Sequence, residues 1–308
     1  MASFALIKEL YEKTDKNGNG YLDMIVIGDK NEYPAKVWRF ENNGQFEKNS
    51  VVEIEYTVDN YKGKQQLNIT SIKKAPDEMI SEFVPTSEYD GKSVFAMLLN
   101  KVNDFKDQEL KDIVKSILLE RREKLEIYPA AYRLHHAIVG GLMLHTASIV
   151  EMAEKTCQVY PNIDRELLLS GAILHDVAKT FEMETDKTGL CTGYTVSGEL
   201  IGHLVKGAMM VDETAKKLGI TSEKVILLEH MIISHHELPE YGAAVRPKFL
   251  EAEILATLDA LDATIFEINA ATSKVEPGNF TDRQWALDSR KLYNHGLSST
   301  EHTVNLGE

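Results

Sequence analysis

The first 75 residues alternate between apolar and polar positions with the period of a β-strand. Strand-like runs span residues 21–27, 33–40, 51–58 and 66–72, and the third of them alternates strictly. Turn-forming residues separate these runs, for example Gly28-Asp29 and the link at Tyr61-Lys62-Gly63-Lys64. Four or five short strands with this turn chemistry predict a small barrel.

After about residue 91, apolar residues recur every three or four positions, which is the period of an α-helix. One apolar stripe consists of Leu110, Ile113, Val114, Ile117 and Leu118. A second apolar run ends at Leu174 and begins behind Asp164, a residue type that caps helix N-termini. The pattern predicts a helix that continues through His175, Asp176 and Lys179 and presents all three on one face.

Other signals predict where the neighbouring helices begin and end. Pro129 suits the first position of the helix that carries His145, and on such a helix His136 would lie about 180° away from His145. His135 and His136 are therefore expected to support ligands or touch substrate. Gly219 is expected to end one helix, Thr221-Ser222 to cap the next, and Pro247 to start the last.

Composition and length predict a two-domain protein without a membrane anchor. The chain has 308 residues, of which 43% are hydrophobic. Its two cysteines form no CxxC motif and are expected to be reduced thiols of a cytoplasmic protein. The start of the chain lacks the features of a signal peptide, and no apolar run is long enough to span a bilayer.

The charge is distributed unevenly between the two halves. The net charge is −14, but residues 1–75 are neutral, with 11 basic and 11 acidic residues. An acidic protein is a poor match for nucleic acid, whose phosphates are drawn to basic surfaces. The neutral half is a better match for nucleic acid than the net charge indicates, and bound cations would neutralise part of the acidic half.

Histidines and aspartates stand inside or at the ends of several apolar helical runs. These candidate ligands are His145, His175, Asp176, His203, His235, His236, Asp259 and Asp262. Imidazoles mixed with carboxylates suit a divalent transition ion. A carboxylate beside an imidazole can bridge two ions, as two-metal hydrolysis of phosphoesters requires.

The order His, His-Asp, His, His-His, Asp resembles the HD superfamily of metal-dependent phosphohydrolases, in the form with extra histidines for a second ion. The flanking segments are similar to those of the YhaM-type bacterial 3′-to-5′ exoribonucleases. They are Pro129-Ala130-Ala131, His135-His136-Ala137, Gly140-Gly141-Leu142, His145-Thr146, the run from Gly198 to His203 and the run from Glu276 to Thr281. The likeness covers nearly the whole chain.

The resemblance implies an OB-fold barrel at residues 1–80, a linker at 81–90, an all-helical HD domain with a C-terminal extension at 91–298, and a tail at 299–308. It implies a 3′-to-5′ exonuclease that uses two divalent ions, Mn²⁺ being the first candidate, to hydrolyse single-stranded RNA, with single-stranded DNA as a further candidate substrate. Asp176 would bridge the ions and Lys179 would contact a phosphate oxygen. Asp259 fits the HD pattern as a ligand, which leaves Asp262 to orient a ligand histidine. A homo-oligomer is a candidate assembly.

The resemblance also implies that the barrel binds single strands. OB-folds stack bases on aromatic side chains while Lys and Arg follow the backbone. The candidate residues are Tyr33, Lys36, Trp38, Arg39, Tyr61 and Lys64. Packing in the barrel core is the alternative role for each aromatic residue.

Two alternative functions stay open at this point. The first is an HD-type nucleotide or cyclic-dinucleotide phosphohydrolase regulated by its barrel. The second is a non-catalytic single-strand-binding protein with structural metals. Against the second stands the number of candidate ligands, which exceeds the four that a closed structural site needs.

Overall fold

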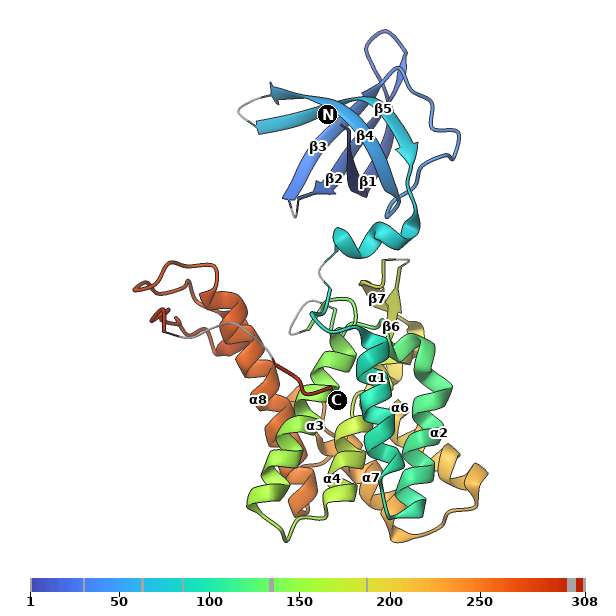
Figure 1. The fold of residues 1–308 in the computed structure, drawn as a ribbon, viewed down its shortest axis with the longest axis vertical. Coiled ribbons are helices and arrows are strands. Elements are labelled where there is room, and N and C mark those ends of the chain that lie inside the picture. Colours follow the sequence, from blue (N-terminus) through green and yellow to red (C-terminus); the bar gives the residue numbers. More distant parts are fainter. Residues whose placement is uncertain are drawn as a thin grey trace. The chain divides into compact units, whose positions relative to one another are not determined.

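A computed structural model gives the fold of the chain (Figure 1). The structure describes residues 2–29, 31–61, 64–84, 86–132, 136–186, 188–297 and 303–306, and the side chains of residues 2, 60, 61, 64, 77, 78 and 81 lie outside this description. The backbone divides into two compact units. One unit holds Met1–Thr86 with Asp186–Thr188, and the other holds Ser87–Thr185 with Gly189–Glu308. The domain boundaries given above stay predictions.

The first unit is a closed five-stranded barrel, as the alternating pattern predicts. Its strands are β1 (Ala2–Thr14), β2 (Gly20–Gly28), β3 (Asn31–Trp38), β4 (Val51–Tyr61) and β5 (Lys64–Lys74). They join in the order β1-β2-β3-β5-β4, with β3 and β5 parallel and the other neighbours antiparallel. Leu22, Met24 and Val26 alternate into the barrel interior with Ala35 and Val37 of the next strand. The expected OB-type barrel is confirmed.

Strand β1 is the one that the sequence pattern does not predict. Its apolar residues Leu6, Ile7 and Leu10 are spaced like those of a helix, with Lys8 and Glu9 between Ile7 and Leu10. A bulge between Ile7 and Glu9 shifts its register against β2. The bulge breaks the period of two on which recognition of a strand depends. Strand β1 pairs with both β2 and β4 and closes the barrel.

The second unit is helical. Its helices are α1 (Gly91–Asn103), α2 (Gln108–Leu125), α3 (Gly141–Val159), α4 (Arg165–Leu174), α5 (Lys179–Glu182), α6 (Val196–Leu218), α7 (Glu223–Ser234) and α8 (Leu250–Thr272). Helix α4 is central and packs against α2, α3, α7 and α8. Short 3₁₀ turns lie at Asp77–Glu82, Pro239–Tyr241 and Trp285–Leu287. Within the described part of the chain, no helix is both long enough and apolar enough to cross a bilayer.

A small hairpin interrupts the helices, which the sequence analysis did not expect. Strands β6 (Met183–Thr185) and β7 (Cys191–Tyr194) pair in antiparallel fashion between α5 and α6. Two of the predicted caps are in place: Asp164 accepts a hydrogen bond from the backbone N–H of Leu167 at 3.0 Å, and Gly219 ends α6 in the left-handed conformation. Ser222 stands at the N-cap position of α7, but its hydroxyl donates to Glu109 and does not cap the helix.

Three helix predictions are wrong. Helix α4 ends at Leu174, so His175 caps it and Asp176 lies in the turn that leads to α5. Helix α8 starts at Leu250 and not at Pro247. Helix α3 starts at Gly141 and not at Pro129, because a backbone loop carrying His136 lies against its first turn. A Cβ atom at Gly141 would lie 2.1 Å from the carbonyl oxygen of His136.

Candidate metal centre

Five histidines each have one ring nitrogen held by an acceptor, which leaves the other ring nitrogen available as a ligand. The Nδ1 atoms of His175, His235 and His236 donate to the carbonyl oxygens of Ala172 (2.8 Å), Ile232 (2.7 Å) and Tyr241 (2.8 Å). Those of His145 and His203 donate to carboxylates, Asp262 at 2.7 Å and Glu182 at 2.9 Å. With Nδ1 protonated, each Nε2 offers a lone pair to a cation.

One group of ligand atoms gathers around His145 and His175. Their Nε2 atoms are 3.3 Å apart. Oδ2 of Asp176 lies 3.5 Å from Nε2 of His145 and 3.3 Å from Nε2 of His175. Oδ1 of Asp259 lies 3.1 Å and 3.9 Å from the same two atoms. These atoms belong to four residues, which lie on α3, at the C-terminal end of α4 and in the turn after it, and on α8. We call them the first ligand group.

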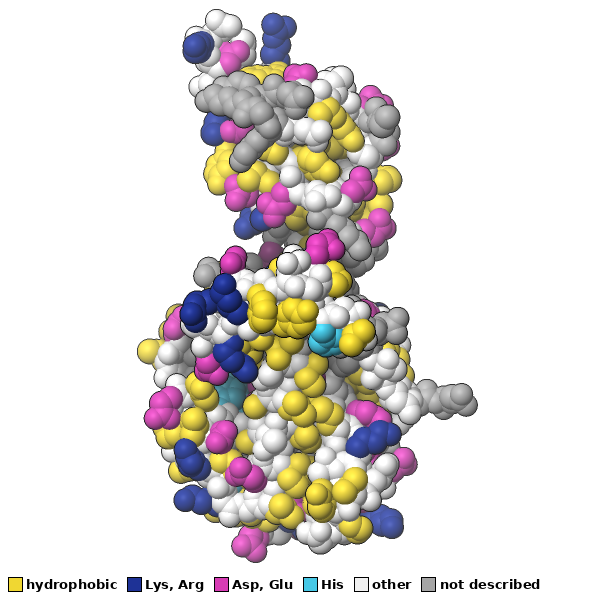
Figure 2. Space-filling model, turned by 90° about the vertical axis from the view of Figure 1, so that its left-hand side faces the viewer, with side chains coloured by type: hydrophobic (Ala, Val, Ile, Leu, Met, Phe, Trp, Pro, Cys, Tyr) yellow, Lys and Arg dark blue, Asp and Glu magenta, His cyan; other side chains and the backbone are white. Residues whose placement is uncertain are grey.

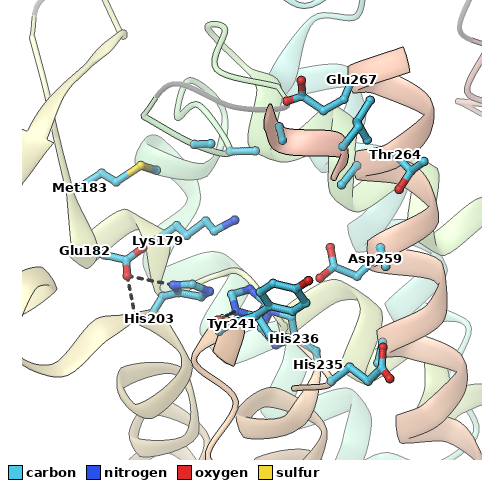
Figure 3. Close-up of a pocket in the computed structure, with 18 of the residues that line it drawn as sticks. Lys179, Glu182, Met183, His203, His235, His236, Tyr241, Asp259, Thr264 and Glu267 are labelled. Carbon is cyan, nitrogen blue, oxygen red and sulfur yellow. Dashed lines mark hydrogen bonds and ion pairs between the residues drawn. The ribbon is translucent and has the colours of Figure 1, made fainter. Parts of the chain in front are cut away.

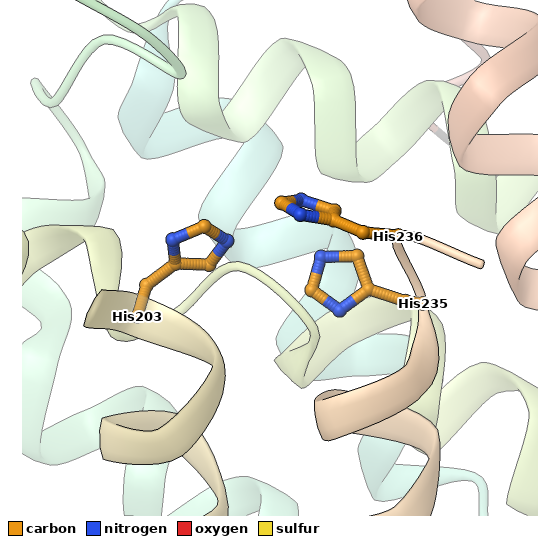
Figure 4. Close-up of side chains that lie close together, drawn as sticks. All are labelled: His203, His235 and His236. Atoms are coloured by element: carbon orange, nitrogen blue, oxygen red, sulfur yellow. The ribbon is translucent and has the colours of Figure 1, made fainter. Parts of the chain in front are cut away.

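A second group forms around the other oxygen of Asp176. Oδ1 lies 3.4 Å from Nε2 of His203 and 3.7 Å from Nε2 of His235. His236 completes a cluster with His203 and His235, whose ligand atoms all lie within 4.8 Å of one another. Figure 4 shows the three rings facing one another across the end of α7 and the kinked part of α6. We call this set the second ligand group, and Asp176 belongs to both.

The chemistry of these atoms fits divalent cations. Asp176 is only 1% exposed, and its Oδ1 atom has no hydrogen-bond partner among the described residues. The same holds for Nε2 of His203 and Nε2 of His235. Buried polar atoms without partners are rare and costly, and three of them meet here. Imidazole and carboxylate donors at these separations suit transition ions.

Electrostatics around the first ligand group favour a positive charge. Burial lowers the pKa of His145, but hydrogen bonds with Asp259 and Asp262 outweigh it and raise that pKa to about 10. Burial would raise the pKa of Asp259, but the hydrogen bond and the charge of His145 hold it well below its usual range. The two aspartates thus stabilise positive charge at His145.

Asp259 and Asp262 lie on opposite sides of the His145 ring. Asp259 faces Nε2, whereas Oδ2 of Asp262 accepts hydrogen bonds from Nδ1 of His145 at 2.7 Å and from Nε2 of His136 at 2.9 Å. Burial would raise the pKa of Asp262, but these hydrogen bonds keep it far below the usual range. His136 is buried, and Asp262 bridges its ring and the ring of His145. His135 lies outside the described residues.

Lys179 is buried beside the two groups. Its Nζ atom lies 2.6 Å from Oδ2 of Asp176. Burial would lower the pKa of Lys179, but the charge of Asp176 raises it, so the ammonium group stays charged. Lys179 also lines the cavity described next and points into it (Figure 3).

The ligand groups open into a cavity of about 580 Å³. Figure 3 shows Lys179, Glu182 and His203 on one side, Asp259 and Glu267 on the other, and His236 and Tyr241 between them. Its remaining walls include Tyr194 and the C-terminal segment Ala286-Leu287-Asp288 with Arg290. The cavity is large enough for one nucleotide-sized ligand.

Glu182 is a residue that the sequence analysis missed. Helix α6 is broken at Gly202 (φ 74°, ψ 165°), which deprives the N–H of His203 of a helical partner. Oε1 of Glu182 accepts this N–H at 3.1 Å and Nδ1 of the same histidine at 2.9 Å. One carboxylate therefore fixes both the backbone and the ring of His203. A glutamate 21 positions before the histidine gives no local signal of this contact.

The barrel residues proposed to bind nucleic acid differ in exposure. Trp38 is 47% exposed and stacks on Tyr21, with ring centroids 4.7 Å apart. Nζ of Lys36 lies 5.0 Å from the Trp38 ring centroid. Arg39 is exposed, whereas Tyr33 packs partly against the barrel core. The side chains of Tyr61 and Lys64 lie outside the description.

Comparisons with known proteins give one family match within the helical unit and one weak structural likeness. The family model described as "HD domain" matches residues 142–264. One solved structure, the second OB-fold domain of replication protein A from Methanococcus maripaludis, is 14% identical, covers 24% of this chain and 80% of its own, and has a TM-score of 0.20, which is too low to support an argument.

Curated relatives named 3′-5′ exoribonuclease YhaM match nearly end to end. The protein from Geobacillus sp. (strain WCH70) is 32% identical over 301 residues, covering 96% of this chain and 92% of the relative. Those from Listeria monocytogenes (serotype 4b, strain CLIP80459) and Bacillus pumilus are each 31% identical, covering 94% of this chain and 94% and 92% of their own. The resemblance is confirmed, and the chain belongs to the YhaM family of 3′-5′ exoribonucleases.

Proposed function

We propose that this protein is a divalent-metal-dependent exonuclease that removes nucleotides from the 3′ end of single-stranded RNA. The observation that carries the proposal is the shared carboxylate: the two oxygens of Asp176 belong to two separate ligand groups. Membership of the YhaM family supports the direction and the RNA substrate. In this proposal the first group is His145, His175, Asp176 and Asp259, and the second is Asp176, His203, His235 and His236.

Two divalent ions, for which Mn²⁺ is the first candidate, would lower the pKa of water and neutralise charge on the phosphodiester. The chain's own residues prepare the site. Asp262 and Glu182 orient His145 and His203. Lys179 is positioned to exchange part of its contact with Asp176 for a phosphate oxygen of the substrate, because its Nζ borders the cavity.

We assign the barrel to binding of the strand away from the site of cleavage. Exposed Trp38, stacked on Tyr21 with Lys36 above both rings, supports this role. The proposed strand-binding residues of the barrel also include Arg39, Tyr33, Tyr61 and Lys64. We further propose that the enzyme acts in the cytoplasm, that single-stranded DNA is a second substrate and that copies of the chain associate.

The direct test uses full-length protein and an oligoribonucleotide labelled at its 5′ end. With Mn²⁺ we expect a ladder of labelled products that shorten one nucleotide at a time, and with excess EDTA we expect none. A nucleotide or cyclic-dinucleotide substrate serves as the comparison. Hydrolysis of nucleotides without shortening of the oligoribonucleotide would favour the nucleotide phosphohydrolase, and binding without any cleavage would contradict an enzymatic function.

Glu182→Ala should weaken binding of a cation by the second ligand group, because both the backbone and the ring of His203 lose their acceptor. Loss of such a supporting carboxylate typically lowers metal affinity by about 10–100-fold. Titration calorimetry with Mn²⁺ should show one weakened phase beside one unchanged phase. Glu184→Ala, two residues away and exposed, is the matched control. Two unchanged phases in Glu182→Ala would contradict the positioning role.

A further inference from the structure

The segment that follows α8 folds into a hairpin, which we call the C-terminal hairpin (residues 280–293; orange to red in Figure 1). Its two arms pair through backbone bridges between Phe280 and Tyr293 and between Gln284 and Arg290. Asp288 and Ser289 at its tip both have positive φ, 54° and 55°, which is the geometry of a type I′ turn. Within the hairpin, the side chains of Thr281 and Leu287 are buried.

The hairpin is tied to α8. The side-chain amide of Asn294 donates to the carbonyl oxygens of Val275 at 2.7 Å and Thr272 at 3.3 Å, at the end of that helix. The N–H of Gly278 donates to the carbonyl oxygen of Asn294 at 2.7 Å, which closes the base of the hairpin. The surface that the hairpin presents is therefore held in place and does not depend on binding to form.

Three aromatic side chains of the hairpin face solvent. Phe280 is 61%, Trp285 76% and Tyr293 50% exposed, and the rings of Phe280 and Tyr293 lie 5.0 Å apart. Tryptophan is a costly side chain to leave in water, and exposed apolar surface of this kind marks binding sites. Figure 2 shows Lys and Arg side chains gathered beside hydrophobic ones near the upper end of this unit.

Cations are interleaved with these aromatics. The hairpin carries Arg283, Arg290 and Lys291 against two acids, in a chain whose net charge is −14. Within the described part of the chain, none of the three takes part in an ion pair. The guanidinium groups of Arg283 and Arg290 are instead oriented by the carbonyl oxygens of Ser289 and Leu287, each at 3.0 Å.

The tip of the hairpin borders the cavity at the ligand groups. Ala286, Leu287, Asp288 and Arg290 all line it. When the 3′ end of a strand enters this cavity, the rest of the strand must lie along one of its walls. The wall that the hairpin forms carries both cations and exposed aromatic rings. Aromatic rings that stack bases, combined with cations that follow phosphates, are how proteins hold single strands without sequence preference.

We propose that the C-terminal hairpin is a second binding surface for single-stranded RNA, which holds the nucleotides next to the 3′ end as that end enters the cavity. The bases stack on Phe280, Trp285 and Tyr293, and Arg283, Arg290 and Lys291 contact the phosphates. This inference rests on the proposed exonuclease function and assigns to the helical unit a strand-binding role separate from that of the barrel.

The chain has two tryptophans, Trp38 in the barrel and Trp285 in the hairpin, which allows a direct test. In full-length Trp38→Phe with Asp176→Asn, which blocks cleavage, Trp285 is the sole tryptophan. A single-stranded oligoribonucleotide should quench its emission saturably, at the concentration that saturates the anisotropy of a labelled oligoribonucleotide. Inorganic phosphate should not. Saturated anisotropy with unchanged Trp285 emission would overturn the proposal.

Kinetics on the cleaving enzyme give the second test. Phe280→Ala with Trp285→Ala should raise KM for the oligoribonucleotide roughly tenfold or more, with a much smaller effect on kcat. Arg283→Gln with Lys291→Gln should flatten the salt dependence of KM, by a slope of about 0.7 for each lost phosphate contact. Tyr160→Ala is the matched control, since Tyr160 is 58% exposed at the end of α3 remote from His145.

An unchanged KM in the double aromatic variant would reject the proposed role of the hairpin while keeping the exonuclease. If the molar mass of that variant in light scattering also changed, the hairpin would be a contact between copies of the chain. A wild-type enzyme that shortens no oligoribonucleotide would instead reject the proposed function.

Discussion

Asp176→Asn is expected to lower the rate of phosphodiester hydrolysis by several orders of magnitude while the fold stays intact. The carboxylate is the only group that belongs to both ligand groups, and its two oxygens face different histidines. Asparagine keeps the size of the side chain but replaces one oxygen with an NH₂ group, which cannot bind a cation, and removes the negative charge from the other oxygen. Both groups therefore lose affinity from one change.

Folding should tolerate this change. Lys179 loses its partner, but its Nζ borders the cavity and can be solvated there, so a charge is not left sealed in the core. The measurement is kcat for the oligoribonucleotide with Mn²⁺, together with the melting temperature. Asp212→Asn is the control, because Asp212 is a partly exposed aspartate of α6 that pairs with Lys216. Activity above about a tenth of wild type, a loss of only ~1.4 kcal/mol in the barrier, would contradict the two-ion arrangement.

The identity of the candidate ligands could be predicted because each lies inside or at an end of an apolar run. His175 follows the central helix α4, and His235 follows α7, which packs against α4, α6 and α8. Such positions place a polar side chain in the interior, where it needs a partner or a cation. Residue type and local pattern are sufficient for this step.

The division of these ligands into two groups could not be predicted. It depends on Asp176 lying in a turn, with one oxygen toward α3 and α8 and the other toward α6 and α7. A continuous helix through His175 and Asp176, as the pattern predicts, would not itself specify this. The turn results from tertiary packing around α4, which overrides the local helical signal.

The same limit applies to the contacts that Glu182 and His136 make. Glu182 contacts His203 because α6 breaks at Gly202, and His136 contacts Asp262 because the loop before α3 folds back over Gly141. Both contacts join residues that are far apart in the chain and lie on irregular backbone. Periodicity describes only regular elements, so it cannot locate them.

Asp259→Asn and Asp262→Asn are expected to differ in kind, although the two residues are three apart on one helix. Asp259 faces Nε2 of His145 and His175, the atoms that offer lone pairs. Asp262 faces Nδ1 of His145 and holds its ring in place. Asp259→Asn should therefore abolish cation binding by the first ligand group, whereas Asp262→Asn should weaken it by about 10–100-fold.

Elemental analysis after reconstitution with excess Mn²⁺ separates the two cases. Asp262→Asn should reach the wild-type content at high Mn²⁺ and fall below it at low Mn²⁺, whereas Asp259→Asn should stay lower by one ion per chain at every concentration tested. His136→Gln should weaken binding in the same direction as Asp262→Asn, because His136 donates to the Asp262 oxygen that also orients His145. If Asp262→Asn loses the ion outright while Asp259→Asn only weakens binding, the roles of the two aspartates are exchanged, and the ring of His145 would have to turn over to present Nδ1 to the cation.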